Sequence, residues 1–376
     1  MKPSLSLTRS VGAALLLGLA FAAACAHARE RWSEPQANAW YDKQPWLVGA
    51  NFIPSNAINQ LEMWQADTFD AVTIEKELGL AESIGMNTVR VFLHDLLWQQ
   101  DARGFANRID IFLTIAARHH IKPLLVIFDS CWDPSPKLGA QHPPIPGIHN
   151  SGWVQSPSAS ALMDLKETPR LETYVKGVIG RFAKDERILG WDLWNEPDNE
   201  PSTAYPRTDA KHKNLLVAAL LPQVFAWARS VDPRQPVTSG LYKDDDWSVE
   251  AMSPFERMQL EQSDVISFHD YEWPEDYERR VHWLQAWHRP ILNTEYMARS
   301  VGSTIDQILP LAKQYRVAAF NWGLVDGKEQ TRLPWDSWDH PYIKSEPPVW
   351  LHDLFHVDGT PYRQREIDLI RALTPR

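Results

Sequence analysis

Short apolar runs and longer amphipathic stretches alternate along this chain. Eight apolar runs have the length and composition of buried strands; they span residues 46–51, 88–93, 123–128, 190–194, 236–239, 265–269, 290–294 and 318–322. Stretches of helical periodicity lie between them, including residues 68–84, 105–119, 171–183, 211–230, 304–315 and 367–373. Alternating strands and helices predict a parallel sheet with right-handed crossovers. Eight such units predict an α/β protein with a single (β/α)8 (TIM) barrel.

Two connections are longer than a compact barrel needs. Residues 131–167 follow the third predicted strand, and residues 325–350 follow the eighth. Loops of this length are usually functional or disordered, and aromatic content argues against disorder; their tryptophans include Trp132, Trp153, Trp335 and Trp338. We expect both loops to stand on the rim formed by the C-terminal ends of the strands and to wall off one end of a cleft. The alternative is that they pack outward and cover helices.

Composition narrows the classes of partner. The formal net charge of −10 argues against nucleic acid and anionic membranes, and it suits a neutral substrate. Eighteen tryptophans are far above the usual share, and indole rings pack well on the apolar faces of sugars. After the N-terminal segment there is no apolar run long enough to span a membrane. We expect a monomer.

The first 28 residues have the pattern of a signal peptide. Lys2 and Arg9 are positively charged, residues 11–24 are apolar but too short to span a bilayer, and Ala26-His27-Ala28 fits a cleavage site. We therefore expect an exported protein, periplasmic or secreted, with a catalytic domain over residues 29–376.

Cysteine usage leaves one alternative open. Cleavage after Ala28 removes Cys25 and leaves Cys131 alone, so the mature chain could form no internal disulfide. Cys25 could instead be acylated, which would make the protein a lipoprotein. The preceding residues 22–24 are all alanine and lack the large aliphatic residue that usually precedes such a cysteine.

Two glutamates close predicted strands in settings that suit sugar hydrolysis. Glu196 follows the fourth strand in Asn195-Glu196-Pro197, and Glu295 ends the seventh. Retaining glycosidases hold two carboxyl groups about 5 Å apart, and a barrel gathers its strand ends on one rim. We interpret Glu196 as the general acid/base, whose pKa must be raised, and Glu295 as the nucleophile, which must be ionised.

Other residues at strand ends complete a candidate site. Arg90, which alternates with apolar residues in the second strand, would orient Glu295 and favour its ionised form. His269 and Tyr271 share one face of the extended chain after the sixth strand, so Tyr271 could donate to Glu295 and His269 could support Glu196 or bind a hydroxyl. The remaining predicted contacts to sugar are Asn195, Trp322, Trp132 and Trp335.

The ordered set resembles the clan A glycoside hydrolases, and most closely their family 5 with its cellulases and mannanases. The matching pieces are Arg90, Asn195-Glu196-Pro197, His269-x-Tyr271, Thr294-Glu295 and Trp322, in the family's order. The resemblance implies a (β/α)8 barrel, retaining hydrolysis and no cofactor. Family members often carry a histidine near the substrate, and His94-Asp95 could replace it here.

The leading hypothesis is a retaining hydrolase of β-linked oligo- or polysaccharides that acts at chain ends or on short oligosaccharides. A transglycosylase using the same residues and a non-catalytic carbohydrate-binding barrel are the alternatives. The chain has no His-Glu-x-x-His motif and no paired cysteines, so we expect no metal.

Overall fold

The computed structural model describes residues 28–200, 204–205, 207–243 and 246–374. The predicted signal peptide, with Cys25 in it, lies outside the described residues except for its last residue, Ala28. Within the part of the chain that is described, no helix has the length and apolar character needed to cross a membrane.

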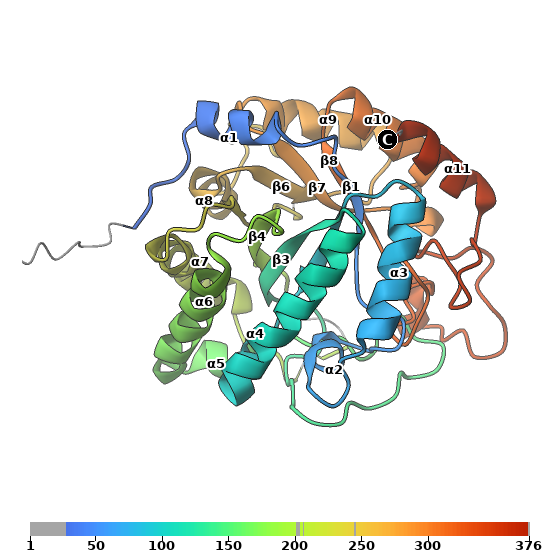
Figure 1. Cartoon of the computed structure of the whole chain (residues 1–376), viewed down its shortest axis with the longest axis horizontal. Coiled ribbons are helices and arrows are strands. Elements are labelled where there is room, and N and C mark those ends of the chain that lie inside the picture. The colour runs from blue at the N-terminus through green and yellow to red at the C-terminus, as the bar shows by residue number, and fades with distance from the viewer. Residues whose placement is uncertain (1–27, 201–203, 206, 244–245, 375–376) are drawn as a thin grey trace, which may run out of the picture.

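Eight parallel strands form the barrel (Figure 1); they are β1 (Val48–Asn51), β2 (Thr88–Phe92), β3 (Lys122–Asp129), β4 (Gly190–Asn195), β5 (Val237–Thr238), β6 (Ile266–His269), β7 (Ile291–Tyr296) and β8 (Ala318–Trp322). Their order is β5-β4-β3-β2-β1-β8-β7-β6. A parallel bridge between Leu241 and Phe268 joins the two outer strands. There Leu241 N donates to Ser267 O at 3.0 Å, and His269 N donates to Leu241 O at 2.8 Å. The predicted (β/α)8 barrel is confirmed.

Helices surround the strands (Figure 1); they are α1 (Glu34–Tyr41), α2 (Gln60–Trp64), α3 (Ala71–Ser83), α4 (Asp95–Arg118), α5 (Ala159–Met163), α6 (Thr168–Phe182), α7 (Lys213–Ser230), α8 (Pro254–Gln262), α9 (Pro274–Gln285), α10 (Ile305–Gln314) and α11 (Gln364–Leu373). The helix predicted from residue 105 begins earlier, at Asp95. Asp101 has non-helical backbone angles inside α4, and this kink interrupts the helical period of the sequence.

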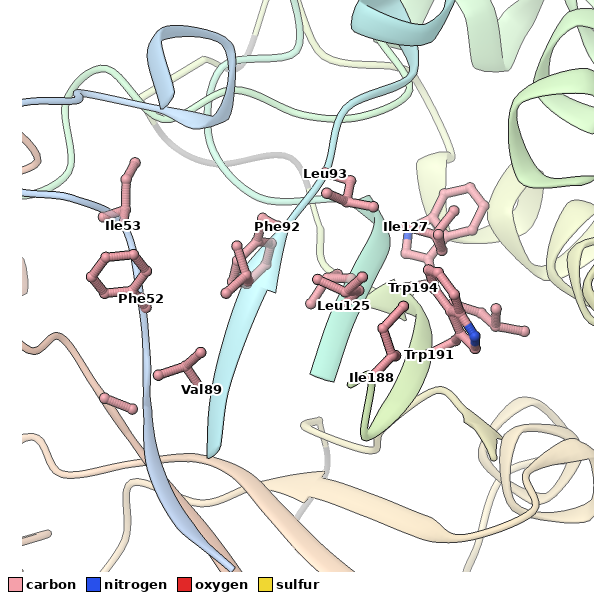
Figure 2. Packing of buried hydrophobic residues seen from close by; sticks show 14 of the residues in the cluster. Phe52, Ile53, Val89, Phe92, Leu93, Leu125, Ile127, Ile188, Trp191 and Trp194 are labelled. Atoms are coloured by element: carbon pink, nitrogen blue, oxygen red, sulfur yellow. The ribbon is translucent and has the colours of Figure 1, made fainter. Parts of the chain in front are cut away.

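The strands are buried on both faces, as expected for a parallel sheet covered by helices. Figure 2 shows apolar side chains packed along β2, β3 and β4, among them Phe92, Leu125 and Trp194. Trp191 and Trp194 of β4 are both fully buried, so they stabilise the core and do not line a cleft. A second apolar cluster joins Trp32 and Tyr41, at α1, to the starts of several strands and fills the opposite end of the barrel.

The two long connections pack against each other beyond the C-terminal ends of the strands. Asn150 N, in the loop after β3, donates to Glu329 O, in the loop after β8, at 2.7 Å. Tyr342 N donates to Gly147 O at 2.9 Å. The backbone of each loop thus supplies hydrogen-bond partners to the other, which fixes both loops above β3 and β8.

Candidate active site

Glu196 is the first residue after β4, and its backbone is in the left-handed region with φ 43°. This conformation is unfavourable for residues other than glycine, and residues that adopt it occur often at functional sites. Within the described part of the chain, three groups contact the carboxylate. Asn199 Nδ2 donates to Oε2 at 2.7 Å, Cys131 Sγ donates to Oε2 at 3.1 Å, and His269 Nδ1 lies 3.0 Å from Oε1.

Glu295 lies near the end of β7, where the strand carries an irregularity. The pairing of β6 with β7 shifts so that His269 lies opposite Glu295, and Thr294 is the extra residue. Bulges of this kind re-aim side chains beside active sites. Arg90 Nη1 donates to Glu295 Oε1 at 2.8 Å, and the Tyr271 hydroxyl donates to Oε2 at 2.8 Å. Both oxygens of this carboxylate are therefore held by donors.

The two glutamates face each other across a short gap. One carboxylate oxygen of Glu196, one of Glu295 and a ring nitrogen of His269 all lie within 4.8 Å of one another. His269 Nδ1 is 3.4 Å from Glu295 Oε2, so this ring lies between the two carboxylates. Nearest oxygens this close are compatible with the short carboxyl spacing of retaining glycosidases.

Arg90 is fully buried and connects several strands below the cleft. Its Nη2 donates to Asp192 Oδ2 and to Asn195 Oδ1, both at 2.7 Å, and its Nη1 also donates to Asn51 Oδ1 at 2.9 Å. A guanidinium with this many partners cannot rotate without losing several charge-assisted hydrogen bonds. Arg90 therefore fixes the position of Glu295 relative to β4.

Burial dominates the electrostatics of the two carboxyls. It raises the pKa of Glu196, against hydrogen bonds from Cys131 and Asn199. It also raises the pKa of Glu295, against the charge of Arg90 and the hydrogen bond from Tyr271. Burial lowers the pKa of His269 to about 4, so this imidazole is neutral near pH 7.

A cavity of about 430 Å³ opens above the two carboxylates. Its lining residues are Cys131, Trp132, His149, Trp153, Asn195, Glu196, Asn199, Tyr242, Tyr271, Glu295, Trp322, Trp335 and His352. Trp132 also stacks on Trp338, with ring centroids 5.3 Å apart. The long loops thus supply aromatic walls to the cavity. Of the predicted site residues, Arg90 and His269 lie behind this lining, against the carboxylates.

The cavity also contains residues that no sequence motif marks as site residues: His149, His352, Asn199, Tyr242 and Cys131. Cys131 and Asn199 are close in sequence to predicted site residues, but the two histidines lie in loops without a motif that could mark them.

The suggestion that His94-Asp95 faces the substrate is wrong. Both side chains are fully buried. His94 Nδ1 accepts from Leu96 N at the start of α4, and Asp95 bonds Ser156 and Arg170.

Glu196, His269 and Glu295 are also the one group of potential metal ligands that the described residues bring together. Arg90 already places a positive charge 2.8 Å from a Glu295 oxygen. A second cation in contact with the same carboxylate would be repelled by the guanidinium. The donor set therefore fits proton transfer and nucleophilic attack better than it fits a metal.

Neither a protein-family model nor a curated protein matches the chain. Solved structures do match its fold. GH5_18 from Streptomyces cattleya, solved with GlcNAc, has a TM-score of 0.59 at 14% identity, covering 88% of this chain and 80% of that one. For the endo-1,4-beta-mannanase from Rhizomucor miehei the TM-score is 0.57 at 13% identity, with coverage of 89% and 97%.

An exo-beta-1,4-mannosidase from Opitutaceae bacterium strain TAV5 has a TM-score of 0.56 at 20% identity. The match covers 87% of this chain and 59% of that longer protein. At these identities the likeness concerns the course of the backbone. The chain therefore has the same (β/α)8 fold as these glycoside-degrading proteins.

Proposed function

We propose that this protein is a β-glycoside hydrolase that acts with retention of the anomeric configuration. The observation that carries the proposal is the approach of the Glu196 and Glu295 carboxylates, which have oxygens within 4.8 Å of each other above the barrel. At this distance one carboxylate can attack the anomeric carbon while the other carboxyl group protonates the leaving oxygen from the opposite side.

The hydrogen-bond partners support different roles for the two glutamates. Two buried carboxylates this close cannot both ionise easily, so one proton remains on the pair. Arg90 contacts Glu295 directly and stabilises its charge, whereas no side-chain cation among the described residues makes such a contact with Glu196. The proton therefore resides on Glu196, the general acid, and Glu295 is the ionised nucleophile.

The reaction then follows two displacements. A Glu295 oxygen bonds to the anomeric carbon while Glu196 gives its proton to the departing glycosidic oxygen. A water next loses a proton to Glu196 and attacks the same carbon, which releases Glu295 as a carboxylate. Tyr271 and Arg90 hold Glu295 in position for both steps.

The shape of the cavity supports action at chain ends or on short oligosaccharides. The loops after β3 and β8 meet above the rim, and Trp132 and Trp335 from these loops line the cavity. A polymer that passes through an active site needs a groove open at both ends, which interlocked loops obstruct. Because the structural neighbours include mannanases and a mannosidase, we propose β-mannosides as the first substrates to test.

Variants of the two glutamates test the proposed roles. Glu295→Ala should abolish turnover because no covalent intermediate can form. Glu196→Ala should lose on the order of 10²–10⁴-fold in rate on substrates with poor leaving groups and much less on activated aryl glycosides. Added azide should rescue Glu196→Ala and yield a β-glycosyl azide. Equal losses on both kinds of substrate, with no azide product, would refute these roles.

Viscosity of a soluble β-mannan or β-glucan tests the preference for chain ends. Release of reducing sugar with little change in viscosity is expected, because removal of terminal units hardly shortens a polymer. A rapid fall in viscosity at low sugar release would show internal cleavage and overturn this part of the proposal.

A further inference from the structure

Two buried histidines, one from each long loop, line the cavity side by side. His149 belongs to the loop after β3, and His352 lies just beyond residues 325–350, where the loop after β8 continues toward α11. Their ring centroids are 5.6 Å apart, and the residues are 2% and 1% exposed. Neither contacts the carboxylates of Glu196 or Glu295, so the two-displacement reaction gives them no task.

Backbone contacts fix the tautomer of both rings. His149 Nδ1 lies 2.8 Å from Leu333 O, and His352 Nδ1 lies 2.5 Å from Met297 O. A carbonyl oxygen can only accept a hydrogen bond, so each Nδ1 must carry the hydrogen. Burial lowers the pKa of His149 to about 4 and that of His352 well below its usual range. Both rings are therefore neutral near pH 7, and each Nε2 is an acceptor.

Among the described residues no hydrogen-bond partner is found for Nε2 of His149 or His352. A sugar hydroxyl is a donor of the kind that such an acceptor needs, whereas an ether oxygen in a glycosidic linkage has no hydrogen to donate.

The histidine pair lies close to residues that surround Glu295. His352 is 5.7 Å from Tyr271 and 6.5 Å from Trp322 by ring centroids, and Tyr271 bonds Glu295. Asn199 contacts Glu196, the proton donor to the leaving group, from a different loop. The leaving group therefore belongs near Asn199, and the opposite end of the sugar ring belongs near the histidines.

We infer that His149 and His352 recognise free hydroxyl groups of the terminal sugar unit, at the ring carbons farthest from the anomeric centre, and so determine specificity for chain ends. This inference rests on the proposed function. In an internal sugar unit, one of these ring carbons carries the next sugar of the polysaccharide. The free hydroxyl is then replaced by an ether oxygen, and the added sugar would have to fit where the two loops meet.

The test combines protein variants with deoxygenated substrates. We would measure kcat/KM for the aryl β-glycoside that the enzyme hydrolyses fastest and for its 3-deoxy and 4-deoxy analogues. The variants are His149→Phe and His352→Phe, which keep an aromatic ring and remove the acceptor. Matched controls are His142→Phe and His340→Phe, exposed residues of the same two loops.

For the wild type and the controls, kcat/KM should be higher for the parent substrate than for at least one deoxy analogue, by a factor on the order of ten. In a histidine variant that ratio should fall toward the value that the intrinsic reactivities of the two substrates set. Because both rates come from one preparation, incomplete folding cancels from the ratio. Unchanged ratios in both variants would overturn the inference and leave the hydrolase intact. Failure to hydrolyse any β-glycoside would instead refute the proposed function, and this inference with it.

Discussion

Among single residues, Cys131 has the least expected position, because its thiol donates a hydrogen bond to the proposed acid/base Glu196 at 3.1 Å. Burial raises the pKa of the thiol well above its usual range, so the sulfur keeps its hydrogen near pH 7. The bond favours the ionised form of Glu196 and so lowers the pKa of that carboxyl. The thiol thus both positions the carboxyl of Glu196, the proposed proton donor, and lowers its pKa.

Cys131→Ala should therefore raise the pKa of Glu196. Since Glu196 must be protonated to act as the acid, the alkaline limb of the kcat/KM–pH profile should move to higher pH. The rate at the optimum should fall roughly two- to tenfold through poorer positioning. Cys131→Ser keeps a donor and should leave the limb near that of the wild type. An alkaline limb identical in the alanine variant and the wild type would show that the thiol has no influence on the proton donor.

At this scale, most residues that the sequence singles out lie in strands or just after them, whereas Trp132 and Trp335 lie in the long loops. Arg90, Glu196, His269 and Glu295 are placed by the barrel itself, so their strand positions bring them together. His149 and His352 reach the same cavity through long irregular loops, whose course depends on contacts between two segments about two hundred residues apart. No local pattern encodes such a contact.

Among the elements, the interlocked loops after β3 and β8 do most to set the shape of the site. Gln330 Nε2 donates to Ile145 O and Ile148 O at 2.8 and 3.0 Å, and His149 N donates to Ser337 Oγ at 2.9 Å. Each loop is thus ordered by the other. Neither loop contains a long helix or strand that could hold it in place alone.

Deletion of residues 328–346 should open the cavity and raise KM for small aryl glycosides roughly tenfold, equivalent to about 1.4 kcal/mol of lost binding. The deletion removes Trp335 from the wall and leaves Trp132 without the ring of Trp338. Steady-state kinetics measures the effect, with a thermal melt as the control for folding. An unchanged KM in a folded deletion variant would mean that these loops do not confine the substrate.

The sequence predicts the regular elements well because all eight strands are short apolar runs between amphipathic helices. Prediction from the sequence fails where the first turns of a helix lack the usual helical spacing of apolar residues. Residues 95–100 precede the kink at Asp101 and lack a continuous apolar face with the rest of α4, so only the later turns were predicted. His94 starts this helix through its side chain, which is a less common cap than serine or aspartate.

For the whole molecule, we propose that export removes the first 28 residues. Arg29, the expected first residue of the mature chain, is held by Asp264 at 2.6 Å and by Gln235 O at 3.2 Å. The segment next to the cleavage site is thereby tied to the barrel. Intact-mass analysis of protein secreted by a bacterial host should give a chain that begins at Arg29. A chain that begins at lipid-modified Cys25, or one that keeps Met1, would contradict the proposal.

The barrel brings β4 and β7 to one rim and so places the two glutamates at the short separation that the proposed reaction requires. The stereochemistry of the first-formed product tests that geometry most directly. Proton NMR during early turnover of an aryl β-glycoside should show the β-anomer of the released sugar, followed by slow mutarotation. Initial release of the α-anomer would mean a single displacement by water, and it would contradict the double displacement through Glu295.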